Sequence, residues 1–501
     1  MEQLTGLDAS FLYMETPSLH MHVSMVAVLD PTTVPGGYSY QKVRDLIGTR
    51  LAQVPVFRRR LVEVPFRLGH PYWVDDESFD LDNHLHRADL PPPGEATQLA
   101  DLVGAICSRQ LDRSKPLWEM HIVEGLAHDR IAVVSKIHHS AVDGVTGAEL
   151  LAQLFDLEPD PPLREPAAPY TEHDQVPSEL RLVLRALTGH ITAPVDVSRL
   201  VWRTGRSMLK VRQVRRSEGQ NKGALPLTTP RTSLNAAITP HRRVAFSAIP
   251  LASVKEVKNA LDVTVNDVIL TLCTGVLRRY LTDRGELPSE PLVATVPVSV
   301  HPSTQDRRGT NKISAMFVGL PCAVSDPVKR LEIIRSVTKG AKSEQNALGA
   351  DVLLNWAEHA APNVFSIAAR TYTRLRLADR HRPIHSLIIS NVPGPDFPLY
   401  LAGSEIQATF PLGPVMDGAG LNITAMSYRG VINWGFIGCT ETVPDLPSIA
   451  EALPETLDEL RMAIDLAPAV RIDFASPRSG PDSVPGQRRR RSSSPSRADR
   501  S

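Results

Sequence analysis

Two adjacent histidines, His138 and His139, are the residues whose types and spacing most clearly indicate chemistry in this chain. They follow the apolar run 131–137 and precede Asp143 and Gly144. A neutral imidazole has an ordinary pKa of about 6.5, so it can accept a proton near neutral pH. The glycine can take a positive φ or let the backbone approach a ligand closely. The pattern predicts a general base where a strand passes through a loop into a helix.

Only one of the two histidines is expected to face a substrate, because adjacent side chains at a strand end point in opposite directions. The other histidine should pack inward. Asp143 can orient the loop through backbone amides or by pairing with an arginine elsewhere. The residues alone leave open a structural alternative, in which a buried histidine precedes an ordinary Asp-Gly turn. No metal site is predicted, because no cysteine, glutamate or third histidine lies at metal spacing near the pair.

Other catalytic signatures are missing from the sequence. It contains no G-x-S-x-G elbow, no G-x-x-x-x-G-K-[ST] loop and no well-placed G-x-G-x-x-G. The sequence therefore does not support assignment as a serine hydrolase, a P-loop nucleotidase or a dinucleotide oxidoreductase. The four cysteines are far apart, so we expect small buried hydrophobic residues in a reducing compartment.

Apolar strand-like runs alternate with amphipathic helical runs through both halves of the chain, which predicts an α/β or α+β layered fold. The expected strands are 25–29, 131–137, 292–300, 386–389 and 431–437. The expected helices are 99–109, 148–157, 265–281 and 328–345.

Composition divides the chain into four parts. A Pro-rich polar stretch and a basic helical segment interrupt the layered pattern, and the end of the chain is rich in Pro, Ser and Arg with little to bury. We predict an N-terminal domain at 1–158, a linker with a basic helix at 159–235, a C-terminal domain at 236–475 and a disordered tail at 476–501. The basic helix has two interpretations, attachment to an anionic lipid surface or a solvated connection.

The charge of the chain bears on its partners and its location. Its 55 basic and 55 acidic residues give no net charge, which argues against a nucleic-acid partner. No apolar run reaches the roughly 18 residues of a membrane span, and residues 1–15 lack the features of a signal peptide. We therefore expect a cytoplasmic protein, with peripheral contact to the inner face of the plasma membrane or to lipid inclusions left open.

The segment from His138 to Gly144 resembles the HHxxxDG motif of the CoA-dependent acyltransferase superfamily. That superfamily also contains peptide-synthetase condensation domains and chloramphenicol-acetyltransferase-like enzymes. Further segments are similar to the bacterial wax ester synthase/diacylglycerol acyltransferase family. Within that family the sequence resembles mycobacterium-type triacylglycerol synthases most. These segments are Pro116-Leu117-Trp118, Asn266-Asp267 and 390–395, together with 7–11, 21–23 and 112–113.

This resemblance, which covers roughly residues 1–465, implies an α/β fold of two chloramphenicol-acetyltransferase-like domains with the active site at their interface. It implies that His139 is the base that deprotonates an acceptor hydroxyl as its oxygen attacks an acyl-CoA thioester. His138, Asp143 and Gly144 would support the site. Acyl-CoA is then a co-substrate, and no bound cofactor is expected. Diacylglycerol is the expected acceptor, with a long-chain alcohol as the alternative.

The other motif residues have structural as well as substrate-binding interpretations. Trp118 is typical of a core aromatic residue, and Asp267 at a helix start suits an N-terminal cap. Ser390 and Asn391 precede a rigid Pro-Gly-Pro turn that either lines a substrate channel or ends a strand. The substrate-binding candidates are Pro116, Leu117, Trp118, Asn266, Asp267, Ser390 and Asn391.

Two other functions compete with the acyl-CoA-dependent enzyme. A condensation-type domain would accept carrier-bound acyl groups, but the chain has no carrier-domain sequence and contains the PLW- and SNVPGP-like segments. A non-catalytic lipid-surface protein would use the basic helix to bind membranes. The intact His139 and Asp143 argue against it.

Overall fold

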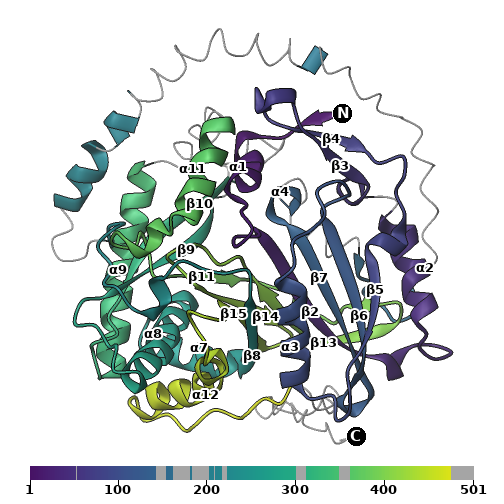
Figure 1. The fold of residues 1–501 in the computed structure, drawn as a ribbon. Helices are drawn as coiled ribbons and strands as arrows, with labels where there is room; N and C mark the ends of the chain where they lie inside the picture. The colour runs from purple at the N-terminus through teal and green to yellow at the C-terminus, as the bar shows by residue number, and fades with distance from the viewer. Residues whose placement is uncertain are drawn as a thin grey trace, which may run out of the picture.

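The computed structural model describes most of the chain, and its strands and helices are drawn in Figure 1. The described residues are 1–51, 54–142, 154–161, 181–182, 202, 204–207, 209–216, 223–300, 312–348 and 362–474. Several predictions lie outside them. These are the positions of Asp143 and Gly144, most of the helix 148–157, most of the linker 159–235 and the tail 476–501.

Within the described residues, one six-stranded sheet carries the motif histidines at the end of a central strand. Its order is β12 (Tyr400–Leu401), β13 (Ser404–Leu412), β2 (His22–Asp30), β7 (Arg130–His138), β6 (Trp118–Leu126) and β5 (Leu85–Asp89). Side chains alternate between its faces along each strand. Val133 and Ile137 of β7 therefore enter one core, whereas Val134 enters a second core with α3 (Ala96–Cys107).

A second six-stranded sheet is built from the C-terminal half. Its order is β10 (Lys312–Leu320), β9 (Leu292–Val300), β11 (Leu387–Val392), β14 (Leu421–Tyr428), β15 (Val431–Cys439) and β8 (Arg242–Pro250). Its apolar side chains share one core with four helices. These are α7 (Leu251–Ala260), α8 (Val265–Asp283), α9 (Pro327–Leu348) and α12 (Leu446–Met462). The strands and helices predicted in this half are confirmed, apart from their exact ends.

One strand joins the two halves of the molecule. β13 comes from the C-terminal half of the sequence but pairs antiparallel with β2 of the N-terminal sheet. Its backbone passes so close to β15 that a Cβ atom on Gly435 would lie 2.0 Å from the carbonyl oxygen of Pro411. The pairing therefore crosses the predicted boundary between domains 1–158 and 236–475, and that division stays a prediction.

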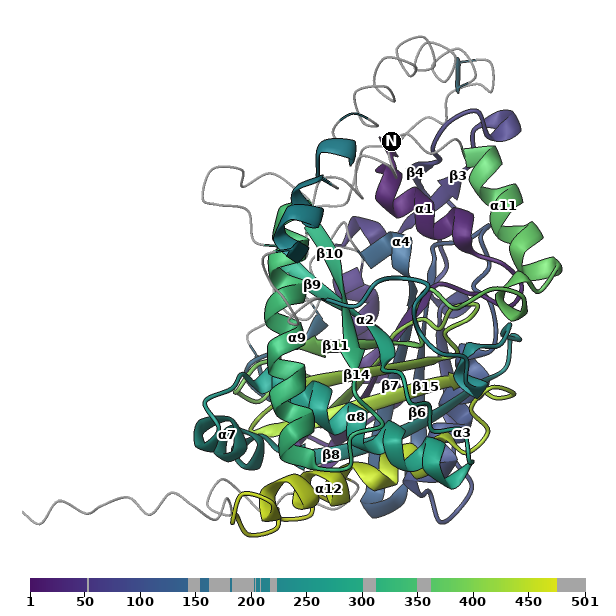
Figure 2. The ribbon, with the colours of Figure 1, turned by 90° about the vertical axis from the view of Figure 1, so that its left-hand side faces the viewer.

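The remaining elements gather mainly at one end of the molecule. In both views α1 (Gly6–Met14), α4 (His139–Val142) and α11 (Pro362–Arg374) lie near the small sheet of β1 (Glu2–Gln3), β4 (Tyr72–Asp75) and β3 (Arg59–Val62) (Figures 1 and 2). Helix α2 (Tyr40–Leu51) packs against the N-terminal sheet. Short 3-10 helices span Pro31–Thr33, Pro55–Phe57, Pro65–Arg67, Leu81–Asn83, Ala127–Asp129, Ser233–Asn235 and Leu377–Asp379.

No single helix of the described part of the chain is long and apolar enough to cross a membrane. Helices α7 and α8 together meet that test of length and composition, but they are bent by 105° at the break between them. Their apolar residues belong to the core beside the C-terminal sheet.

Candidate active site

The backbone of the two motif histidines is held by the residues that immediately precede the strands on both sides of β7. The amide of His138 donates to the carbonyl oxygen of Leu117 at 3.0 Å, and the amide of His139 donates to that of Met21 at 2.9 Å. His138 is also the register partner of His22 on β2. Residues of the PLW segment and of segment 21–23 therefore fix where β7 ends and where the two side chains point.

His138 packs inward and lies beside an ion pair between the buried Glu15 and the partly exposed Arg113. Its Nδ1 accepts a hydrogen bond from the amide of Ser140 at 3.1 Å, so its proton must reside on Nε2. Nε2 lies 3.7 Å from a carboxylate oxygen of Glu15, and Arg113 Nε donates to that oxygen at 2.7 Å. Burial lowers the pKa of His138 well below its ordinary value. The expectation that one histidine packs inward is confirmed.

His139 is a neutral imidazole held against an aromatic ring. Its ring stacks on Phe11 of α1, with centroids 4.1 Å apart and planes 27° apart. Nδ1 is buried and has no hydrogen-bond partner among the described residues. Burial lowers the pKa of His139 to about 4, so the ring is unprotonated at neutral pH and able to accept a proton.

A pocket beside this network is lined by residues from both halves of the chain. Tyr13 and Arg113 come from the N-terminal half, whereas Ser366 and Arg370 belong to α11. Helix α11 also packs on α1, where the ring of Phe365 meets that of Tyr13 at 6.3 Å. The histidine network therefore lies close to where the two halves of the molecule meet.

The PLW segment belongs to the core of the N-terminal sheet. Pro116 and Leu117 are buried, and Trp118 is 2% exposed. The indole donates from Nε1 to the carbonyl oxygen of Phe57 at 2.8 Å and stacks on His84. It also lines an apolar pocket, together with Phe57 and other residues, on the face opposite His138. The core interpretation of Trp118 is supported, and a role in substrate binding stays a prediction.

Asp267 caps a helix, as its position at a helix start suggested. One carboxylate oxygen accepts from the amide and the hydroxyl of Thr264, and the other accepts from the hydroxyl of Thr338 on α9 at 2.8 Å. Asn266 is half-buried on the same turn of α8. The described hydrogen bonds join neither residue to His138 or His139, and α8 lies lower than α4 in both views (Figures 1 and 2).

Ser390 and Asn391 end β11, which runs parallel to β14. Ser390 is half-buried and Asn391 is exposed. The turn that follows is held on β14, because the amide of Gly394 donates to the hydroxyl of Ser427 at 3.2 Å. A side chain at Gly394 would clash with the carbonyl oxygen of Ser427. The turn thus ends the strand, and contact of Ser390 and Asn391 with a substrate stays a prediction.

Three residues around the histidines received no role from the sequence. Phe11 and Arg113 lie in segments 7–11 and 112–113. The resemblance of these segments to a family pattern was the sequence feature that could have indicated a role for the two residues. Glu15 had no signal of its own. Its contact with His138 depends on the fold bringing the end of α1 beside the end of β7.

Comparisons with known proteins agree with these features. A family model described as "Wax ester synthase/diacylglycerol acyltransferase catalytic domain" matches residues 4–269, and one described as "WS/DGAT C-terminal domain" matches residues 309–461. A relative from Mycobacterium tuberculosis (strain ATCC 25618 / H37Rv), provisionally named a diacylglycerol O-acyltransferase, is 40% identical over 469 residues, covering 93% of this chain and 92% of its own.

Solved structures share the fold. The wax ester synthase/diacylglycerol acyltransferase from Marinobacter aquaeolei VT8 matches with a TM-score of 0.64 and 29% identity, over 93% of this chain and all of its own. The first condensation domain of the CDA synthetase matches with a TM-score of 0.52 and 14% identity, over 94% and 97% of the two chains. The second likeness concerns the fold alone. Together they confirm the predicted two-domain α/β fold.

Proposed function

Because this chain belongs to the wax ester synthase/diacylglycerol acyltransferase family, we propose that it transfers a long-chain acyl group from acyl-CoA to diacylglycerol and so makes triacylglycerol. The observation that carries the proposal is the neutral imidazole of His139 directly after β7, stacked on Phe11. Its neighbour His138 lies beside the Glu15–Arg113 pair, and Arg113 lines a pocket formed by both halves. The names of the relatives support acyl transfer to a hydroxyl.

In the proposed reaction His139 acts as a general base. The acceptor oxygen attacks the carbonyl carbon of the thioester while its proton passes to the imidazole, which gives a tetrahedral oxyanion. The intermediate collapses with cleavage of the carbon–sulfur bond, and the CoA thiolate takes the proton back from the imidazolium. The products are the ester and free CoA, and the step leaves no acyl group on the enzyme.

We assign supporting roles to the residues around the base. The carboxylate of Glu15, paired with Arg113, lies 3.7 Å from Nε2 of His138, and we propose that its charge helps to orient that ring. His138 in turn fixes Ser140 in the first turn after the strand. Asp143 and Gly144 remain proposed supports of the same loop. The other motif residues remain proposed substrate contacts. Of these, Asn391 is exposed to solvent, whereas Ser390 and Asn266 are half-buried.

A long-chain alcohol is the second proposed acceptor, since the family description also names wax ester synthesis. An imidazole base handles a primary and a secondary hydroxyl by the same proton transfer. Both acceptors are lipids, so we also propose peripheral contact with a lipid surface through the basic helix. Its described part exposes Trp202 (65%) and Leu209 (68%), and Arg206 lies over the Trp202 ring.

The test compares wild type with His139→Ala, using labelled palmitoyl-CoA and either diacylglycerol or hexadecanol. We expect neutral lipid from wild type and a loss of at least about 100-fold in the variant, because general bases contribute rate factors of about 10²–10⁴. His241→Ala is the matched control, since His241 is exposed, pairs with Glu441 and has no described contact with His138 or His139. Equal rates for His139→Ala and wild type would refute the base assignment. A folded wild type that consumes neither acceptor would refute the proposed reaction.

A further inference from the structure

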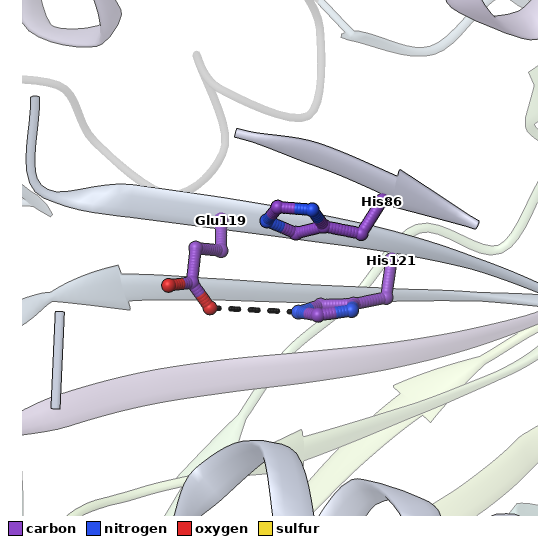
Figure 3. Close-up of side chains that lie close together, drawn as sticks. All are labelled: His86, Glu119 and His121. Atoms are coloured by element: carbon purple, nitrogen blue, oxygen red, sulfur yellow. Dashed lines mark hydrogen bonds and ion pairs between the residues drawn. The ribbon is translucent and has the colours of Figure 1, made fainter. Parts of the chain in front are cut away.

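Three potential metal ligands lie together on the face of the N-terminal sheet that packs on α3. Glu119 and His121 are two residues apart on β6, so their side chains point to the same face. β5 runs parallel to β6, and its His86 is the direct register partner of His121. Figure 3 shows the result, with the His86 ring beside that of His121 and the Glu119 carboxylate directed at His121. Strand register, more than any flexible loop, brings the three side chains together.

The distances suit a single ion after small side-chain rotations. One ligand atom from each residue lies within 4.8 Å of the others, and His121 Nε2 is 3.5 Å from Glu119 Oε2. Zinc bonds of about 2.0–2.2 Å at tetrahedral angles place ligand atoms about 3.3–3.6 Å apart. The cluster must therefore contract by about an ångström, which rotation about side-chain bonds can supply without moving either strand.

A cavity gives the cluster access to solvent. It has a volume of about 490 Å³ and is lined by His86, Glu119 and His121, together with Ile106 of α3 and the loop that follows it. An ion can therefore enter, and a water molecule can take a fourth position. Three protein ligands with an open fourth position are a common zinc arrangement.

The carboxylate is held in place by a buried lysine. Lys136 of β7 is fully buried, and its ammonium lies 3.0 Å from Glu119 Oε2. The same ammonium donates to the carbonyl oxygens of Ile106 and Arg109, each at 3.1 Å. Lys136 thus contacts the same carboxylate oxygen that faces His121 and holds Glu119 in place, as outer-shell partners orient metal-binding carboxylates. Its positive charge also weakens cation binding, so we expect an exchangeable ion and not one that resists dialysis against a chelator.

We propose that His86, Glu119 and His121 bind one divalent transition-metal ion, with Zn²⁺ as the best match to two imidazoles and a carboxylate. The donor set lacks thiolates and is poor in oxygen, which favours Zn²⁺, Co²⁺ or Ni²⁺ over Ca²⁺ or Mg²⁺. The ion joins the edge strand β5 to β6. This site is separate from His139, and it departs from the prediction that the chain has no metal site.

The experiment uses the full-length, untagged protein, stripped with a chelator and then titrated with Zn²⁺ by calorimetry. We expect one equivalent bound by wild type, and at least a tenfold weaker affinity in both His86→Ala and His121→Ala. His241→Ala should bind like wild type, because its histidine pairs with a single carboxylate. Co²⁺ should give the intense visible absorption of a tetrahedral site in wild type and not in the two variants.

Two results would overturn the proposal. One is a wild type that is folded by circular dichroism and binds no Zn²⁺ at concentrations up to the millimolar range. The other is one equivalent bound with unchanged affinity in folded His86→Ala and His121→Ala, which would locate the ion elsewhere. Either result leaves the assignment of His139 intact, since the calorimetric readout does not depend on turnover.

Discussion

The protonation of His139 sets the pH range in which the proposed base can work. A base must be unprotonated, and burial has lowered this pKa to about 4. We expect kcat/KM to fall on the acid side with a midpoint near 4–5 and to stay level from pH 6 to 8. An acid limb near 6.5 in folded wild-type protein would mean that the imidazole is solvated, contrary to this structure. The measurement is a pH–rate profile with folding checked at each pH.

Phe11 provides a way to shift the acid limb of this pH–rate profile. Its ring covers His139, and Phe11→Ala would let water reach the imidazole. Solvation favours the protonated form, so the pKa should rise toward 6.5 and the acid limb should move to higher pH. Phe11→Leu keeps an apolar cover and should retain the wild-type limb. Identical profiles for the alanine variant and wild type would show that Phe11 does not exclude water from the base.

The ion pair behind His138 gives a prediction about positioning. Arg113→Met leaves the buried carboxylate of Glu15 without its partly exposed cation, so we expect a loss of about 1–3 kcal/mol in the free energy of unfolding. The double variant Arg113→Met with Glu15→Gln removes the uncompensated charge and should recover part of that loss. Urea unfolding of the three proteins measures both effects. No recovery in the double variant would mean that Arg113 does not act through Glu15.

The sequence could predict the histidine pair but not its surroundings. His138 and His139 stand at the end of an apolar run, which is a local pattern. Glu15 and Phe11 reach them from more than a hundred positions away in the chain, and no local pattern encodes such a contact. The cluster of His86, Glu119 and His121 has a similar origin. The Glu-x-His spacing on β6 was visible, but the third ligand depends on the parallel register of β5.

At the scale of elements, the close crossing of β13 and β15 should tolerate no added side chain. A Cβ atom on Gly435 would meet the backbone of Pro411 at 2.0 Å, so Gly435→Ala should lower the free energy of unfolding by about 1–3 kcal/mol or more. Gly319→Ala on β10 is the matched control, because its nearest neighbour would be 3.7 Å away. Equal melting temperatures for the two variants would contradict this account of the crossing.

Strands and helices with a clear period were predictable, and their pairing was not. The run 292–300 is β9, and 265–281 lies inside α8, because alternation or helical spacing reports burial along one element. The pairing of β13 with β2 joins residues nearly four hundred positions apart. Neither strand carries a local feature that names the other as its partner.

At the scale of the whole molecule, buried neutral histidines should make the protein sensitive to acid. His22, His138, His139 and His385 all have pKa values lowered by burial, the last two to about 4. In the unfolded chain they titrate near 6.5. Below that pH the unfolded state binds protons that the folded state does not, so the free energy of unfolding must fall as pH decreases from 6.5 toward 4.

The expected size of this effect is roughly 2 kcal/mol at pH 5 for each of His139 and His385, relative to pH 7.5. Urea unfolding at the two pH values measures it. The free energy of unfolding of His385→Leu should depend less on pH, by the contribution of His385, because leucine does not titrate. A stability that is equal at pH 7.5 and 5 would contradict the burial of these rings.

The late position of β13 in the sequence has a consequence for how the protein is made. A ribosome completes β2, β7 and both motif histidines long before it reaches residues 404–412. Until then β2 has an open edge with unpaired amide and carbonyl groups, which is the kind of surface that recruits strands from other molecules. The sheet of the N-terminal half therefore cannot close before residues 404–412 have been synthesised.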